Sequence, residues 1–180
     1  LRWRTRTEFA VAPDGSVGLR PHRSHAVLPI DDCLLATEAV VGTGVLQRDP
    51  HTIAEDVAAF DVVAPSVGEP IVTPVPRDRE PSPVLDVCER VSAGGIEADF
   101  VVSARGFWQV HPGAVATFLD AALDLLAPRP GERALDLYSG VGVFAAALAV
   151  ATGPTGQVVA IESDPVASAQ AQANLAAYPQ

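Results

Sequence analysis

The stretch Arg133-Ala134-Leu135-Asp136-Leu137-Tyr138-Ser139-Gly140-Val141-Gly142 decides the fold. Its first half has the composition of a buried strand, and the two glycines that follow permit a tight turn. Residues 143–151 are then continuously apolar, which is typical of a buried helix. A strand, a glycine turn and a helix in this order predict the opening of a doubly wound, parallel-sheet domain.

The residues on either side extend this pattern. Gly153-Pro154-Thr155-Gly156 predicts a turn, and residues 157–162 predict a second strand. Asp164 and Pro165 suit the N-cap and the first turn of a helix that we expect to run to about Tyr178. Upstream, residues 112–126 have apolar side chains at helical spacing. Residues 105–180 therefore predict the first β-α-β-α part of a Rossmann-like domain.

The N-terminal part of the chain has a different pattern. Polar and apolar residues alternate over residues 3–11, and turn residues at 13–16 precede further short strands at 17–20 and 25–30. A helix broken by glycine is expected at 33–46, and the prolines of residues 61–83 predict loop or edge structure. The predicted fold class is α/β: a β-rich (α+β) domain over residues 1–104, followed by an incomplete Rossmann-like domain over residues 105–180.

Charge is unevenly distributed along the chain. The net charge is −10, yet residues 1–25 contain five arginines against only Glu8 and Asp14. A local basic patch can meet a polyanion such as RNA even on an acidic protein, although a solvated strand face explains it equally well. Two cysteines are too few for a disulfide framework, so we expect reduced thiols and a cytoplasmic protein. The absence of a long apolar run predicts no membrane partner.

The glycine turn has the features of a nucleotide-type site. Glycines allow close approach of a ligand to the backbone, and the helix N-terminus offers free amides. Glu162 follows the next strand, where its carboxylate can accept hydrogen bonds from both ribose hydroxyls. The spacing Gly140-x-Gly142-x-x-Ala145 also fits dinucleotide cofactors loosely. Asp136 favours S-adenosylmethionine, because class I methyltransferases carry an acidic residue there and a pyrophosphate gains nothing from it. The alternatives are a nicotinamide or flavin cofactor, or a remnant of such a site that binds no cofactor.

Two blocks together resemble the RNA uracil-C5 methyltransferases, whose members methylate uridine in transfer RNA or ribosomal RNA. They are Phe107-Trp108-Gln109-Val110-His111-Pro112-Gly113-Ala114 and Leu135 to Phe144. The segments 3–6 and 29–33 resemble that family's central RNA-contacting domain. The resemblance implies cofactor contacts at Gln109, Tyr138 and Glu162, beside Asp136, Gly140 and Gly142. RNA contacts are expected at Arg2, Arg4 and Arg6, in a protein that we expect to be a monomer.

The chain departs from the family in several places. Val143 stands where many members have Asn, and Cys88 matches nothing. Cys33 aligns with the last cysteine of an iron–sulfur set whose other members are absent, so no metal is expected. The family's catalytic cysteine and carboxylate base follow the glycine loop at a distance. We therefore expect no catalytic residue, no turnover and marginal folding in these 180 residues. A methyltransferase of non-RNA substrates and a non-catalytic RNA-binding module with a vestigial cofactor fold are the alternatives.

Overall fold

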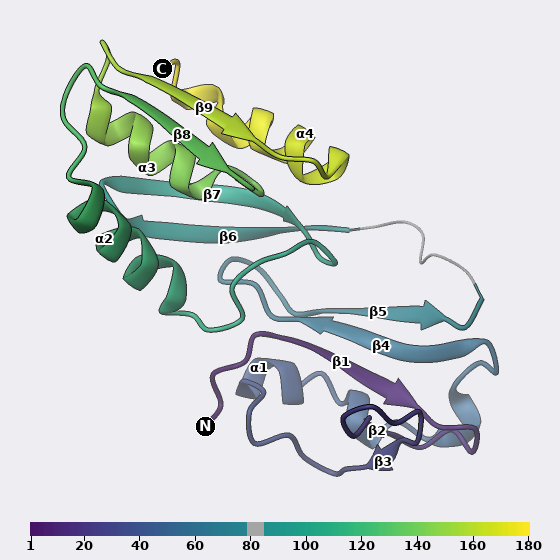
Figure 1. The fold of residues 1–180 in the computed structure, drawn as a ribbon. Coiled ribbons are helices and arrows are strands. Elements are labelled where there is room, and N and C mark those ends of the chain that lie inside the picture. The colour runs from purple at the N-terminus through teal and green to yellow at the C-terminus, as the bar shows by residue number, and fades with distance from the viewer. Residues whose placement is uncertain (79–84) are drawn as a thin grey trace. The chain divides into compact units, whose positions relative to one another are not determined.

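The computed structural model describes residues 1–78 and 85–180, which form two compact units. The first comprises Leu1–Val84 and Val110–Pro112, and the second comprises Leu85–Gln109 and Gly113–Gln180. This division falls earlier than the boundary predicted at residue 104. The reason is that the hairpin of residues 86–103 packs on helices of the second unit (Figure 1).

The first unit is built on an antiparallel sheet of five strands in the order β3-β2-β1-β4-β5. The strands are β1 (Arg6–Val11), β2 (Val17–Leu19), β3 (Leu28–Pro29), β4 (Val57–Val63) and β5 (Ile71–Pro76). In β5, Pro74 and Pro76 lie on an edge strand, as the proline content of this region predicts. Pro81 and Pro83 of the same region lie outside the described residues. The central strand β4 was not predicted, and its residues 61–63 correct the expectation of loop or edge structure there, because this strand ends before the first proline of the region.

Short helices cover this sheet and close its core. They are α1 (Glu38–Val41), which replaces the longer broken helix that was expected, and the 3-10 turns Val45–Gln47 and Pro50–Thr52. Thr37 caps α1 by accepting a 3.4 Å bond from the backbone N–H of Val40. The core gathers apolar residues from strands and helices: Phe9, Val11, Val17, Cys33, Ala36, Val40, Val45, Leu46, Val57, Phe60, Val62 and Ala64.

The second unit combines a hairpin, three helices and a two-stranded parallel sheet. Its elements are β6 (Asp86–Ala93), β7 (Ile96–Ser103), α2 (Ala114–Leu126), β8 (Arg133–Leu137), α3 (Val143–Thr152), β9 (Gln157–Ile161) and α4 (Pro165–Asn174), followed by a 3-10 turn at Leu175–Ala177. Strand β8 pairs with β9 in parallel, in register from Arg133 with Gln157 to Leu137 with Ile161. The predicted β-α-β-α order is confirmed. The hairpin was not predicted.

Helix α3 packs against β8 and β9 and also against β7 (Figure 1). Seven of its ten residues are buried, which explains why the helix is apolar on nearly every side. The other face of the two-stranded sheet is open. Leu135, Leu137, Val159 and Ile161 are each between 42% and 56% exposed there. Among the described residues, no helix is long and apolar enough to cross a membrane.

Candidate cofactor site

The glycine loop joins the end of β8 to the start of α3 and has a strongly constrained backbone. Tyr138, Gly140 and Gly142 all have positive φ, at 61°, 54° and 92°. Ser139 anchors the loop to the neighbouring strand, because its backbone N–H donates to the carbonyl of Ile161 at 3.1 Å. The N–H of Gly142 donates back to the carbonyl of Ser139 at 2.9 Å. The loop therefore has a defined conformation at the carboxyl ends of both parallel strands.

The two glycines are needed for different reasons. A Cβ on Gly142 would lie 3.0 Å from Cδ1 and Cγ of Leu175, so tight packing and the positive φ both disfavour a side chain there. At Gly140 no atom lies within 4 Å of an added Cβ. Its positive φ alone favours glycine. The backbone at Gly140 is thus open to the approach of a ligand, as the sequence predicts for this position.

Glu162 lies directly after β9 and holds the loop through backbone amides. Its Oε2 accepts a 2.8 Å bond from the N–H of Gly140, and its Oε1 accepts bonds from the N–H groups of Ser163 and Asp164 at 2.7 and 2.8 Å. The amides of Asp164 and Gly140 are the main reasons that the pKa of Glu162 is lowered from 4.5. An ionised acceptor therefore stands beside Gly140.

Asp136 is the half-buried carboxylate of β8. Burial raises its pKa above the ordinary 3.8, the N–H of Ala145 in the first turn of α3 opposes this shift, and the charge of Glu162 adds to it. Its Oδ2 is buried without a hydrogen-bond partner among the described residues. An acceptor of this kind is costly to leave unpaired, so it is a candidate to receive a bond from a ligand.

The other two predicted cofactor residues differ in their surroundings. Tyr138 has an exposed side chain (88%), and its left-handed backbone is a strained conformation of the kind that clusters at functional sites. Gln109 belongs to the second unit, as the glycine loop does, and lies one residue before the chain enters the first unit at Val110. It makes no side-chain hydrogen bond within residues 1–78 and 85–180.

Asn174 is a supporting residue that sequence reasoning missed. Its Nδ2 donates to the carbonyl of Val141 in the glycine loop and to that of Val101 in β7, both at 3.0 Å. Its Oδ1 accepts from the N–H of Val101 at 2.9 Å. The amide therefore joins the loop to the hairpin. The only available signal was a polar residue near the end of a helix, and such residues are usually solvated.

The three N-terminal arginines predicted to contact RNA are largely engaged within the first unit. Arg2 forms a bidentate pair with Asp32 at 2.8 Å and also contacts Glu38 at 3.1 Å. Nε of Arg4 donates to the carbonyl of Arg6 at 2.9 Å. Arg6 is only 8% exposed. RNA contact by these arginines stays a prediction.

Neither cysteine has the surroundings of a reactive or metal-binding thiol. Cys33 is buried in the core of the first unit. Burial raises the pKa of Cys88 on β6, and the charge of Asp99 raises it further. Among the described residues, no group of three or more His, Cys, Asp or Glu side chains could hold a metal ion.

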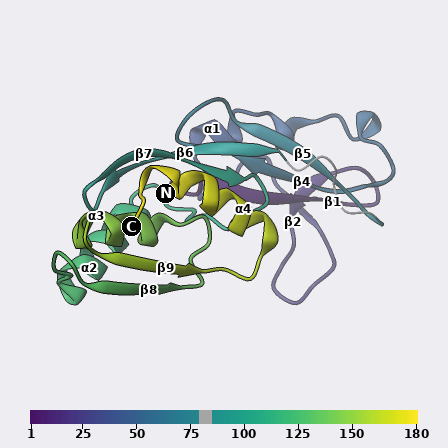
Figure 2. The ribbon, with the colours of Figure 1, turned by 90° about the horizontal axis from the view of Figure 1, so that it is seen from above.

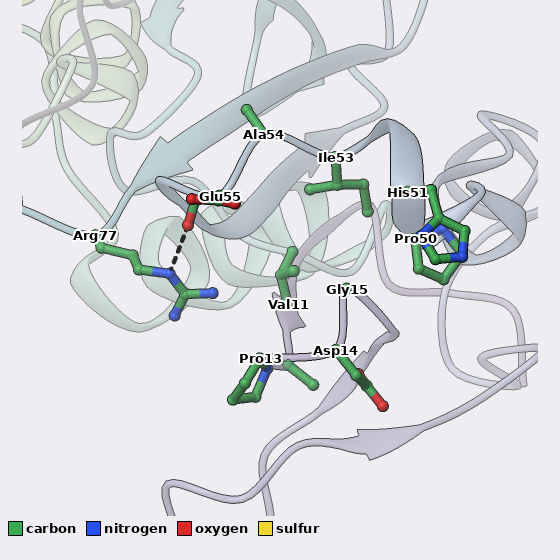
Figure 3. Close-up of a pocket in the computed structure, with 11 residues that line it drawn as sticks. Val11, Pro13, Asp14, Gly15, Pro50, His51, Ile53, Ala54, Glu55 and Arg77 are labelled. Atoms are coloured by element: carbon green, nitrogen blue, oxygen red, sulfur yellow. Dashed lines mark hydrogen bonds between the residues drawn. The ribbon is translucent and has the colours of Figure 1, made fainter.

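The first unit also contains an open cavity of about 490 Å³ (Figure 3). It lies between the β1–β2 turn, the segment at residues 50–55 and Arg77, whose Nε donates to the carbonyl of Glu55 at 3.1 Å. Asp14 and Glu55 add two carboxylates to its rim. Its lining residues come from three separate segments, so the sequence offered no signal for it. All of the lining residues belong to a different unit from the glycine loop.

The second unit therefore has the fold and the loop of a nucleotide-type cofactor domain, with two carboxylates at the ends of adjacent parallel strands. A family model described as protein-L-isoaspartate(D-aspartate) O-methyltransferase matches residues 111–179. That region holds α2, the parallel strands and α4, and so contains the loop and both carboxylates. Apart from residues 111 and 112 this match lies within the second unit, so it says nothing of the sheet of the first unit.

Similar proteins extend the likeness over almost the whole chain. An uncharacterized RNA methyltransferase of Streptomyces coelicolor is 41% identical over 98% of this chain and 42% of its own length. The 23S rRNA (uracil(1939)-C(5))-methyltransferase of Shewanella sp. is 36% identical over 47% of this chain and 18% of its own. The chain thus spans less than half the length of these relatives.

A solved structure has the same fold. The Pyrococcus abyssi tRNA (uracil-54, C5)-methyltransferase, crystallised with S-adenosyl-L-homocysteine, superposes with a TM-score of 0.65 over 96% of this chain and 52% of its own, at 16% identity. The resemblance to RNA uracil-C5 methyltransferases that the sequence indicated is confirmed. The mixed α/β class with a methyltransferase-type second unit is confirmed as well.

Proposed function

We propose that this chain is the cofactor-binding and RNA-contacting part of an S-adenosylmethionine-dependent RNA methyltransferase that modifies C5 of uridine in tRNA or rRNA. The arrangement of Asp136 and Glu162 around the glycine loop carries the cofactor assignment. The names of the relatives support RNA as substrate, and the uracil-C5 methyltransferases among them support the modified position.

The residues present fit this cofactor. Glu162 is ionised and can accept bonds from ribose hydroxyls, and Asp136 has a buried oxygen that can accept a bond from the amino group of the methionine moiety. The open space at Gly140 admits a ligand close to the backbone. Tyr138 and Gln109 are proposed as further contacts. When bound, S-adenosylmethionine supplies an electrophilic methyl group.

The two cysteines of this chain are not suited to the remaining chemistry. Uracil C5 becomes nucleophilic when a thiolate adds to C6, and a base must then remove the C5 proton. Cys33 is buried in the core, and the raised pKa of Cys88 keeps its thiol protonated at neutral pH. We therefore expect these 180 residues to bind cofactor and RNA without methylating uridine. Methylation of a uridine-containing RNA above background would contradict this expectation.

Calorimetric titration of S-adenosylmethionine tests the cofactor site. Glu162→Gln removes a charged acceptor, so its Kd should be at least about tenfold higher than that of the unmodified chain. Asp124→Asn on an exposed face of α2 removes the same charge away from the site and should leave the Kd unchanged. A vestigial cofactor fold would show no saturable binding in any of the three proteins.

A methyltransferase of non-RNA substrates is the second candidate, since the protein-methylating family model matches the cofactor unit. That unit is shared by methyltransferases with unrelated substrates, so the match does not choose between substrates. RNA titration separates the two candidates. A non-RNA enzyme should show no saturable RNA binding at physiological salt.

A further inference from the structure

The β2–β3 loop, defined here as residues 20–25, is a segment of the first unit that carries exposed basic residues and no acidic one. Between Asp14 and Asp31 the chain contains no acidic residue, whereas this loop contains Arg20, His22, Arg23 and His25. Two of the four histidines of the protein are among them. Figure 2 shows the connection between β2 and β3 projecting from the sheet.

Three side chains of the loop differ from Arg2, Arg6 and Arg20 in their surroundings. Arg2 is paired with two carboxylates, and Arg6 is buried. Arg20 pairs with Glu8 at 3.1 Å. By contrast, the exposed side chains of His22, Arg23 and His25 have no hydrogen-bond or ion-pair partner among the described residues. Arg23 is therefore a full positive charge that no carboxylate offsets.

The backbone of the loop holds Arg23 in place. The N–H of Ser24 donates to the carbonyl of Pro21 at 3.1 Å, which closes a turn with Arg23 at its third position. The φ of Arg23 is +58°, a conformation that usually takes Gly or Asn in such a turn. The side-chain hydroxyl of Ser24 accepts a 3.1 Å bond from the N–H of Ala26, which further orders the loop. An arginine at a strained turn position, where glycine would be more stable, is better explained by a contact than by folding.

The geometry points to the β2–β3 loop as a phosphate-contacting site for RNA, with Arg23 as its principal residue and His22 and His25 beside it. This inference rests on the proposed function, because it names where the RNA backbone is held. An exposed arginine on a projecting loop, with imidazole N–H donors beside it, suits contacts to phosphate, which position RNA without reading its sequence. The acid-free segment also lowers the repulsion that the acidic remainder of the protein exerts on a polyanion.

The test uses the 180-residue chain and a fluorescently labelled RNA hairpin with a uridine in its loop. Arg23→Gly removes the cation and relieves the left-handed backbone, so it should leave thermal stability unchanged or slightly higher. It should raise the Kd for RNA about tenfold and reduce the slope of log K against log salt by about 0.7–0.9. Arg23→Lys should restore most of the affinity, and Arg129→Gln, an exposed change in the second unit, should match the unmodified chain.

The outcomes separate this inference from the proposed function. If the unmodified chain binds RNA and Arg23→Gly binds with the same Kd and salt slope, the loop inference is wrong while RNA binding stands. If Arg129→Gln weakens binding as much as Arg23→Gly, the effect is one of net charge and the inference is likewise overturned. If the unmodified chain shows no saturable binding, the proposed RNA function fails, and the loop inference fails with it.

Discussion

Asp136 is a carboxylate whose surroundings oppose its ionisation. Burial and Glu162 raise its pKa above 3.8, so the folded chain binds this proton more tightly than the unfolded chain does. The stability linked to Asp136 is therefore greatest at low pH and is lost as the pH rises from 3.8 through the folded pKa. Ionisation of Asp136 therefore destabilises the ligand-free fold.

Asp136→Asn should accordingly stabilise the ligand-free chain at pH 7, by about 2 °C in Tm. An asparagine can still accept the bond from the N–H of Ala145 while carrying no charge. The advantage over the unmodified chain should shrink as the pH is lowered towards 4. Thermal melts across this range measure it. The same variant should bind S-adenosylmethionine more weakly, and equal or lower stability at pH 7 would show that burial of the charge is not costly.

The glycines at 140, 142 and 153 should differ in how much stability the chain loses when each is replaced by alanine. Gly142→Ala should destabilise the chain by about 1–2 kcal/mol, since a left-handed φ and a tight contact of the new Cβ with the side chain of Leu175 act together. Gly140→Ala and Gly153→Ala have positive φ but open space, so each should cost less. Of these two, only Gly140→Ala should weaken cofactor binding. Denaturant unfolding and calorimetry give both quantities, and equal unfolding costs at all three sites would contradict the packing argument.

Helix α4 is attached to its unit by the side-chain amides of Gln170 and Asn174. Oε1 of Gln170 accepts from the N–H of Ser103 at 3.2 Å, and its Nε2 donates to Asp86 at 2.6 Å. Asn174 makes a comparable pair of bonds with Val101. These bonds satisfy backbone groups of β7 much as a neighbouring strand would. A helix with few large apolar residues can dock in this way.

Alanine at either position should lower the free energy of unfolding by about 1–3 kcal/mol, because a buried or half-buried partner is left unpaired. Asn174→Ala should also weaken cofactor binding, since Asn174 alone of the two bonds the glycine loop. Gln172→Ala lies on the exposed side of α4 and is the matched control. Chemical unfolding measures the loss of stability in each variant, and cofactor titration measures whether the Kd changes in Asn174→Ala alone. An effect of Gln170→Ala on the Kd as large as that of Asn174→Ala would argue against a positioning role.

At the scale of the whole molecule, the two-unit organisation predicts a local response to cofactor. All of the proposed cofactor residues belong to the second unit. Added S-adenosylmethionine should slow amide exchange in the loop at residues 136–142 and around Glu162. Exchange in the β1–β4 sheet of the first unit should remain unchanged. Hydrogen–deuterium exchange with and without cofactor measures this, and protection of comparable size in both units would contradict it.

The sequence by itself determined the β-α-β-α order, the glycine loop, the edge position of the proline-rich strand and the cap at Asp164, whose Oδ1 accepts from Ala167 at 2.7 Å. Each of these depends on residues close together in the chain, where turn chemistry, capping and periodicity act directly. The likeness to RNA uracil-C5 methyltransferases followed from two such local blocks.

Only the tertiary structure decided which side chains are free to contact a ligand or RNA and which are engaged within the protein. Pairing over long sequence distances placed the β6–β7 hairpin with the second unit and joined Asn174 to the glycine loop. It also paired Arg2 with Asp32 and buried Arg6, while Arg23 was left exposed in a turn. Arginines of equal charge in the sequence thus differ in the fold, because partners and burial depend on contacts between distant segments that local patterns do not encode.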